Sequence, residues 1–167
     1  MINSLWRDRR AIAALNISGR RAEAKFLFRI FSRLELLGER LRRVKDEEGQ
    51  FSLDSLRGLG LDEVEARLLG FKGVGLKTVR CVQVFSLGLP AFPVDTHIFR
   101  ITKRLGIIPT RATPETAHRI MQEAVPPAER LPFHMNLIAH GRGVCKAGRP
   151  LCEGCVIRTW CATGSKA

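Results

Sequence analysis

Two glycines and a lysine stand close together in a pattern that could carry out chemistry on a sugar phosphate. The sequence Phe71-Lys-Gly-Val-Gly-Leu-Lys-Thr78 places Gly73 and Gly75 just before a predicted helix start, with Lys77 one turn beyond them. Because glycine has no Cβ, the turn can take positive φ at these positions and let a second backbone come close. The start of such a helix offers unpaired N–H groups and a positive dipole end, which suits a phosphate group.

Lys77 would then lie near the molecule to which the phosphate belongs. A primary amine attacks C1′ of a sugar only when it is unprotonated, so its surroundings would have to favour the neutral form. Lys72 and Arg80 place positive charge nearby in the sequence, and the surrounding helix is apolar. The alternative interpretation is an ordinary exposed helix lysine, which is the commonest fate of this residue type.

Asp95 lies in the next connection, Val94-Asp-Thr-His97, after Pro90 and Pro93 have ended the preceding helix. One interpretation is that Asp95 is only the N-cap of the helix that follows. The second adds chemistry, because negative charge is stabilised at a helix start and could offset the positive charge that develops on a sugar as its base departs. The two roles are compatible.

Four of the five cysteines close the chain with the spacing C-x6-C-x2-C-x5-C, at Cys145, Cys152, Cys155 and Cys161. Four thiolates in so short a segment could enclose one metal centre, either a tetrahedral zinc or a cubane iron–sulfur cluster. Two disulfides are the remaining alternative. A metal centre could organise the loop over 146–151 and hold Lys146 and Arg149 toward a phosphate backbone.

The composition favours an intracellular protein that binds a polyanion. The 167 residues carry a formal net charge of +12 and are 45% hydrophobic, which predicts a globular fold whose first candidate partner is DNA or RNA. Self-repulsion that keeps the protein soluble, or an acidic lipid partner, would also explain the charge. No apolar run approaches the roughly 20 residues that span a bilayer, and the charged start lacks a secretory signal. A reducing compartment favours metal chemistry over disulfides, and Cys81 is expected to be a core residue.

Apolar spacing and helix caps predict an all-α fold without strands. An amphipathic helix is expected over 22–44, followed by a polar loop over 46–50. Asp95 and Thr113 are the predicted N-caps of two further helices. Together with these two, the helices expected after the loop cover residues 61–69, 76–87, 95–104, 113–124 and 132–140. The helix over 76–87 is apolar nearly all round and is expected to be buried.

Taken in order, four motifs resemble the helix-hairpin-helix DNA glycosylases of the endonuclease III type. They are the hairpin Phe71-Lys-Gly-Val-Gly-Leu-Lys-Thr78, Val94-Asp-Thr-His-Ile-Phe-Arg100, His140-Gly-Arg142 and the cysteine tail. The resemblance covers most of the chain from about residue 51 to residue 161. Each motif alone is moderately specific, whereas all four in this order and spacing are very specific.

This resemblance implies a partial helical barrel, the helix-hairpin-helix region, over residues 1–140 and an iron–sulfur loop over 141–167 that packs on it. It implies a [4Fe-4S] cluster on the four C-terminal cysteines. It also implies a bifunctional DNA glycosylase/AP lyase in which Lys77 is the Schiff-base nucleophile and Asp95 the catalytic carboxylate. Such enzymes flip a damaged nucleotide out of the duplex and cut the strand by β-elimination. Their substrates are usually oxidised pyrimidines and abasic sites.

The implied partner is double-stranded DNA, damaged or abasic, bound by a monomer in the cytoplasm near the nucleoid, with no membrane and no small-molecule substrate. His97 and His140 lack partners in a zinc-like spacing, so they are expected to be structural or to face DNA. The residues expected to contact DNA are Lys72, Gly73, Val74, Gly75, Thr78, His97, Arg142, Lys146 and Arg149.

Two features depart from the family pattern. Lys72 stands where the family hairpin often has proline, and it adds a phosphate contact. The segment before the hairpin lacks the Gln-x-Thr-Asp-like motif that helps to fill the gap left by a flipped base, and its one glutamine is Gln50. The chain therefore resembles the family with its N-terminal portion missing. Lyase activity should survive such a loss better than base recognition.

Two other functions remain open from the sequence. A non-catalytic DNA-binding module would use the hairpin and the cysteine loop only to hold phosphates. An iron–sulfur electron carrier would explain the cysteines, but neither the pairing of Lys77 with Asp95 nor the charge.

Overall fold

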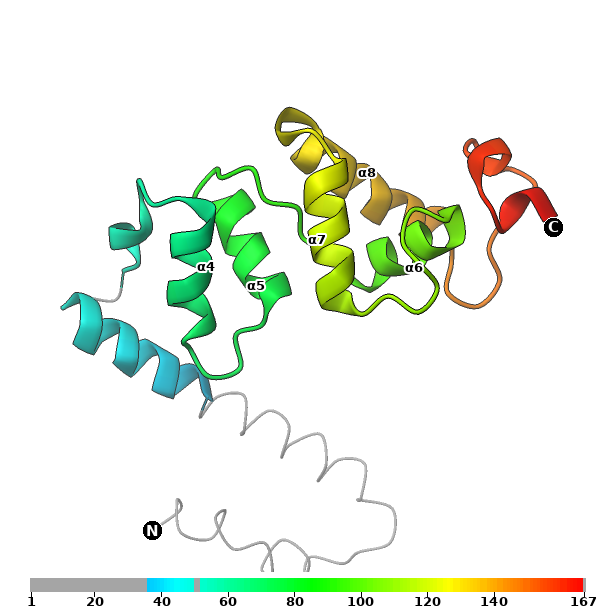
Figure 1. Cartoon of the computed structure of the whole chain (residues 1–167). Helices are drawn as coiled ribbons and strands as arrows, with labels where there is room; N and C mark the ends of the chain where they lie inside the picture. The colour runs from blue at the N-terminus through cyan, green and yellow to red at the C-terminus, as the bar shows by residue number, and fades with distance from the viewer. Residues whose placement is uncertain (1–35, 50–51, 167) are drawn as a thin grey trace, which may run out of the picture. The chain divides into compact units, whose positions relative to one another are not determined.

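The computed structural model of the chain describes residues 36–49 and 52–166, which contain helices and no strand (Figure 1). The chain divides into two compact units, Met1–Ser52 and Leu53–Ala167, and the division expected at residue 140 stays a prediction. In the first unit a helix covers residues 36–48. The rest of the helix expected over 22–44 lies outside the described residues. The loop expected from residue 46 is wrong at its start, because an ion pair between Arg43 and Glu47 supports one more helical turn.

In the second unit, a short 3-10 turn, η1 (Asp54–Leu56), precedes two helices that lie side by side (Figure 1). These are α4 (Leu61–Leu69) and α5 (Leu76–Cys81), and a tight loop joins them. As its acidic first turn predicts, α4 is closed at its start, where the Gly60 N–H donates to Glu63 Oε2 at 2.9 Å. This bond fixes the start of α4.

The helix predicted over 76–87 forms, but it widens at Val82 into a π-helix, η2 (Val82–Ser86). Its expected burial holds only in part, because Val84 is buried whereas Phe85 is 54% exposed. Gln83 takes a fully buried place, and its Nε2 donates to the Leu61 carbonyl at 2.6 Å. Cys81 is a free, partly buried thiol rather than a core residue. The π-turn therefore fastens α5 to α4 through a polar side chain.

Three longer helices follow: α6 (Thr96–Leu105), α7 (Pro114–Ala124) and α8 (Arg130–Gly143). Both predicted caps are confirmed, since Asp95 Oδ1 accepts from the Ile98 N–H at 2.8 Å and Thr113 Oγ1 accepts from the Thr116 N–H at 3.2 Å. The helix expected over 132–140 is longer at both ends. A 3-10 turn, η3 (Pro127–Glu129), leads directly into it, and Pro132 lies in its first turn, where a missing N–H is tolerated.

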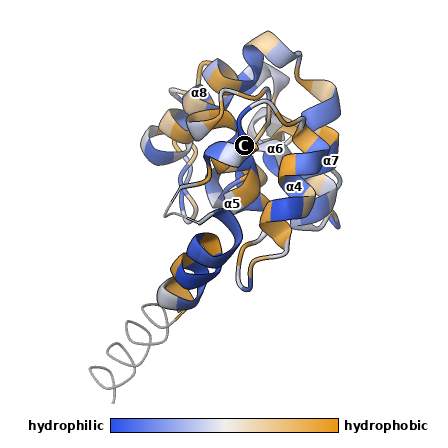
Figure 2. Ribbon diagram, turned by 90° about the vertical axis from the view of Figure 1, so that its left-hand side faces the viewer, coloured by the Kyte–Doolittle hydropathy of each residue, from blue (hydrophilic) through white to orange (hydrophobic). Residues whose placement is uncertain are grey.

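The core of the second unit lies among α6, α7 and α8. Figure 2 shows that the labelled helices α4 to α8 carry both apolar and polar residues. The core is made by Phe92, Val94, Ile98, Ile101, Ile108, Ala117, Met121, Val125 and Leu137. Beyond α8 the chain continues into a loop with two short 3-10 turns, η4 (Arg158–Trp160) and η5 (Gly164–Lys166). Within the described residues, every helix is too short or too polar to cross a membrane.

Helix α8 packs closely against α6 at Gly141, the middle residue of the His-Gly-Arg motif. A Cβ at Gly141 would lie 2.8 Å from His97 Cβ and 3.1 Å from Ile101 Cδ1. Such distances are closer than non-bonded carbon atoms approach. Glycine at this position therefore allows the two helices to come together.

We expect Gly141→Ala to lower the free energy of unfolding by about 1–3 kcal/mol through overpacking, despite the roughly 1 kcal/mol of helix propensity that alanine adds. The matched control is Gly143→Ala in the same helix, where a Cβ would have no neighbour within 4 Å. That variant should be neutral or slightly stabilising. Urea unfolding measures both, and equal effects of the two substitutions would contradict the close contact at Gly141.

Candidate active site and metal centre

The glycine loop joins α4 to α5 as predicted, but only one of its glycines adopts the left-handed conformation. Gly73 has φ 74°, and the Val74 N–H donates to the Phe71 carbonyl at 3.0 Å, which closes the turn. Gly75 is the N-cap of α5 with φ −104°, so the expectation of a positive φ at this glycine is wrong. Nothing lies within 4 Å of the position that a Gly75 Cβ would take. The start of α5 is therefore open on this side.

Lys77 lies in the first turn of α5 and is exposed. The neighbouring Val79 is fully buried, so the helix is anchored by one face while Lys77 projects from another. The apolar surroundings that the sequence predicted for Lys77 are thus found on the opposite side of the helix. The amine is accessible to a large substrate.

Asp95 is half-buried at the start of α6. Its Oδ1 accepts from the Ile98 N–H at 2.8 Å, and its other carboxylate oxygen has no donor among the described residues. The cap fixes the orientation of the carboxyl group without using all of its acceptor capacity. Asp95 can therefore be an N-cap and keep acceptor capacity and negative charge for a second role.

The charges of Lys77 and Asp95 both affect the pKa of His134, a buried residue of α8 that the sequence analysis did not single out. Burial lowers the pKa of His134, the hydrogen bond to the Pro93 carbonyl and the charge of Asp95 raise it, and the charge of Lys77 lowers it. Because both charges act on one ring, the amine and the carboxylate each lie within electrostatic range of His134.

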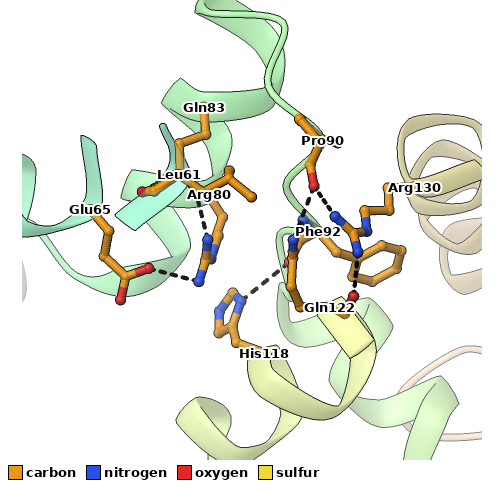
Figure 3. A network of polar contacts seen from close by, with 9 residues as sticks. All are labelled: Leu61, Glu65, Arg80, Gln83, Pro90, Phe92, His118, Gln122 and Arg130. Atoms are coloured by element: carbon orange, nitrogen blue, oxygen red, sulfur yellow. Dashed lines mark hydrogen bonds and ion pairs between the residues drawn. The ribbon is translucent and has the colours of Figure 1, made fainter. Parts of the chain in front are cut away.

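A second cation, Arg80, lies one turn beyond Lys77 in α5, and Figure 3 shows its contacts. It forms an ion pair with Glu65 of α4 at 2.7 Å and donates to Gln83 Oε1 at 3.1 Å. Its Nε is buried without a hydrogen-bond partner among the described residues. Burial lowers the pKa of the nearby His118, the hydrogen bond to the Phe92 carbonyl raises it, and the charge of Arg80 lowers it. Positive charge from α5 therefore lowers the pKa of both buried histidines.

The two buried histidines make stability depend on pH. The pKa of each is lower in the folded protein than its ordinary value, so the unfolded chain binds more protons as the pH falls. The stabilisation that these neutral histidines give the folded protein is complete above about pH 6.5, the ordinary pKa of histidine. It is lost as the pH falls through their lowered pKa values in the folded protein. We expect the urea midpoint to fall between about pH 7.5 and pH 5. The double variant His118→Asn/His134→Asn should show a smaller fall, and an equal fall would contradict this origin.

The four C-terminal cysteines line one cavity with Arg104, His140 and several apolar residues. All four thiols are free and partly buried, so the disulfide alternative is not the arrangement found. Two of the thiols accept from N–H groups, and a third lies beside a histidine ring nitrogen. Arg104 donates to Cys145 Sγ at 3.3 Å, the Gly164 N–H donates to Cys161 Sγ at 3.3 Å, and His140 Nε2 lies 3.8 Å from Cys155 Sγ.

These contacts test which metal centre the cysteines fit. N–H groups directed at sulfur stabilise thiolates and are typical of iron–sulfur sites. Among the described residues, no three His, Cys, Asp or Glu side chains are grouped closely enough to hold a single ion, as a tetrahedral zinc would require. Four free thiols that line one cavity fit an iron–sulfur cluster.

Two arginines of α6 fasten the start of the cysteine loop. Arg100 donates to the Cys145 carbonyl at 2.8 Å and to the Gly141 carbonyl at 3.1 Å. Arg104, one turn later, donates to the Lys146 carbonyl at 2.7 Å and to the Ala147 carbonyl at 3.0 Å. The helix that begins at Asp95 thus also holds the loop. In the sequence, only the repeat of arginine on one face of α6 could have indicated this role.

The residues expected to contact DNA fall into two groups. Val74 and His97 are half-buried, and His97 lies against Gly141 with its Nδ1 3.2 Å from the Arg100 guanidinium. Their contacts with DNA stay predictions. The exposed group consists of Lys72, Gly73, Gly75, Thr78, Arg142, Lys146 and Arg149.

Comparison with known proteins places this geometry among DNA glycosylases, although no protein-family model matches the chain. It is 31% identical over 138 residues to the DNA glycosylase/AP lyase ROS1 of Arabidopsis thaliana, covering 72% of this chain and 10% of that protein. It is 38% identical over 94 residues to endonuclease III of Thermotoga maritima, covering 56% of this chain and 44% of that protein. The chain spans less than half the length of the curated relatives it matches.

The fold agrees with these relatives. The solved structure of a trapped endonuclease III–DNA covalent intermediate matches with a TM-score of 0.68 and 25% identity, over 99% of this chain and 75% of that one. A non-covalent endonuclease III–DNA complex matches with a TM-score of 0.67 and 24% identity, over 99% and 74% of the two chains. The chain is thus an endonuclease III-like homologue within the helix-hairpin-helix DNA glycosylase superfamily.

Proposed function

We propose that this chain is a bifunctional DNA glycosylase/AP lyase of base-excision repair. Its substrates are abasic sites and damaged bases, with oxidised pyrimidines as the first candidates. One observation carries the proposal: the exposed Lys77 and the half-buried Asp95, which caps α6 through one carboxylate oxygen, both lie within electrostatic range of His134. The relatives named as a DNA glycosylase/AP lyase and as endonuclease III support the reaction class.

At a damaged nucleotide, Lys77 Nζ forms a bond to C1′ while the base leaves with the electron pair of the glycosidic bond and takes up a proton. The C1′–O4′ bond then breaks and O4′ takes up a proton from solvent, so the sugar ring opens. At an abasic site the amine adds to the C1′ aldehyde and water leaves. Both routes give a protonated imine between Lys77 and the sugar. Loss of a C2′ proton then breaks the C3′–O bond, and the strand is cut 3′ to the sugar. The negative charge of Asp95 stabilises the cationic sugar in these steps.

DNA binding in this proposal uses the two exposed basic regions of the second unit. The hairpin presents Lys72 and the open start of α5, and the cysteine loop presents Lys146 and Arg149. The net charge of +12 adds a long-range attraction to phosphate. We further propose that the protein acts as a monomer inside the cell, in association with the nucleoid.

We also propose that Cys145, Cys152, Cys155 and Cys161 hold a [4Fe-4S] cluster. The free thiols around one cavity and the N–H groups that donate to two of them support this assignment. When bound, the cluster would provide a structural centre that orders the basic loop, and it takes no part in the reaction on the sugar. Purified protein should contain iron and acid-labile sulfide in equal amounts. Stoichiometric zinc without sulfide would contradict the assignment.

Borohydride trapping tests the proposed activity. The reductant converts an imine between an amine and the sugar into a stable bond, so the protein should become covalently attached to a duplex containing an abasic site. An undamaged duplex of the same sequence is the control and should give no adduct. Binding to both duplexes without any adduct would instead support the non-catalytic DNA-binding module.

A further inference from the structure

The segment from Pro90 to Asp95 brings the carboxylate to the site, yet it has no regular secondary structure of its own. Side chains of α7 and α8 bind its backbone (Figure 3). Gln122 accepts from the Phe92 N–H at 2.7 Å and donates to the Pro90 carbonyl at 3.0 Å. Arg130 also donates to the Pro90 carbonyl. The beginning of the segment is therefore fixed by α7 and by the start of α8.

His134 fixes the other end of the segment. It is 2% exposed, and its Nδ1 lies 2.9 Å from the Pro93 carbonyl oxygen, two residues before Asp95. Because a carbonyl only accepts, Nδ1 must carry the proton. The ring is held edge-on to Phe85 and Phe92, at centroid distances of 5.8 and 6.0 Å. Hydrogen bond and packing together allow the ring one orientation.

The contact between His134 and Pro93 differs from those of Gln122 and Arg130 because it lies nearer to Asp95. Among the described residues, His134 is the buried polar side chain on which the charges of both Lys77 and Asp95 act. It bridges α8 to the segment that ends at Asp95, and its ring contacts Phe85 in η2, the π-helix that continues α5. A shift at Pro93 would move Asp95 relative to Lys77, since one intervening residue separates Pro93 from the cap.

We propose that His134 is a positioning residue for the Lys77–Asp95 pair. Its hydrogen bond from Nδ1 to the Pro93 carbonyl sets where Asp95 begins α6, and hence where the carboxylate faces the sugar. The inference rests on the proposed lyase function. A misplacement of about 1 Å at a reacting group can cost about a hundredfold in rate, so a remote hydrogen bond can have a large effect.

Two variants separate the hydrogen bond from the packing. His134→Phe keeps an aromatic ring between Phe85 and Phe92 but has no donor. His134→Asn loses the ring, but its side-chain amide can place a donor where Nδ1 stands. Single-turnover borohydride trapping on an abasic duplex should be about 10–100-fold slower in His134→Phe, and within about threefold of wild type in His134→Asn. The dissociation constant for DNA should change by less than about twofold in both, because His134 does not reach the surface.

Leu137→Ala is the matched control for lost stability. Leu137 lies one turn further along α8 and is 4% exposed within the core, so its truncation destabilises the same helix without touching the Pro93 carbonyl. Trapping well below its unfolding temperature should stay within about threefold of wild type. An equal loss of rate in Leu137→Ala and His134→Phe would overturn the proposal. So would equal rates in His134→Phe and His134→Asn.

A measurement that needs no activity decides the positioning claim separately. The Ile98 amide donates to Asp95 Oδ1, so its ¹H–¹⁵N signal reports where the carboxylate lies. The signal should move in His134→Phe and return toward its wild-type position in His134→Asn. An Ile98 signal that does not move in His134→Phe would overturn the claim even if wild type forms the adduct. Absence of the adduct in wild type, with the expected Ile98 shifts, would instead refute the lyase function and leave the positioning established.

Discussion

Substitution of Lys77 by alanine should abolish the borohydride-trapped adduct on abasic DNA, reducing its rate of formation by about 10³-fold or more. Lys77 is the amine to which the imine is assigned, and it is exposed in the first turn of α5. Lys77→Arg should have the same effect, because a guanidinium stays protonated while its positive charge preserves attraction to phosphate. Single-turnover trapping with saturating protein measures both rates.

Lys72→Ala is the matched control for Lys77. It removes the exposed lysine of the same hairpin but keeps the proposed nucleophile. We expect DNA binding to weaken modestly and the adduct to form at nearly the wild-type rate at saturation. If Lys77→Arg still forms the adduct at the wild-type rate, or if Lys72→Ala abolishes it, the nucleophile has been assigned to the wrong residue.

Asp95→Asn should lower the trapping rate by about 10²–10³-fold while changing stability little. Asparagine is as good an N-cap as aspartate, so the bond from the Ile98 N–H is retained and α6 still begins at the same residue. What the variant removes is the negative charge that faces the cationic sugar, and loss of one such electrostatic contact has an effect of this size.

A second variant separates the cap from the charge. Asp95→Ala removes both, so it should add a loss of about 1 kcal/mol in unfolding free energy to the same kinetic defect. Thermal unfolding and single-turnover trapping measure the two effects independently. A trapping rate in Asp95→Asn within a few fold of wild type would show that Asp95 is only a helix cap.

The features that sequence predicted well are those set by neighbouring residues. The N-caps at Asp95 and Thr113 form because their side chains bind N–H groups three residues ahead. The loop between α4 and α5 forms at its glycines for a similarly local reason. Such signals lie within one helical turn, so residue type and spacing suffice to predict them.

Contacts between distant residues could not be predicted in the same way. His134 binds a carbonyl 41 positions away and His118 one 26 positions away, and nothing in their sequence neighbourhoods distinguishes them from surface histidines. The side chains of Gln122 and Arg130 that hold Pro90 belong to the same class. These residues act through the tertiary fold, which brings α7 and α8 to the segment before Asp95.

Errors in the local predictions have physical causes too. Glycine permits a positive φ without requiring it, and at Gly75 the N-cap position calls for extended backbone instead. The apolar pattern over 76–87 identified a helix but not its change to a π-helix at Val82, which is tied to the bond from Gln83 to α4. Cysteine spacing predicted that four thiols would lie together, whereas the N–H groups beside two of them come from other parts of the fold.

Peptide mass spectrometry of the trapped adduct tests most directly whether Lys77 and Asp95 serve one sugar. Wild-type protein trapped on abasic DNA, then digested with nuclease and protease, should carry the sugar remnant on the peptide that contains Lys77. The same digestion of Asp95→Asn should show the remnant at the same lysine in much smaller yield. A remnant on another amine, or a full yield at Lys77 in Asp95→Asn, would contradict the shared site.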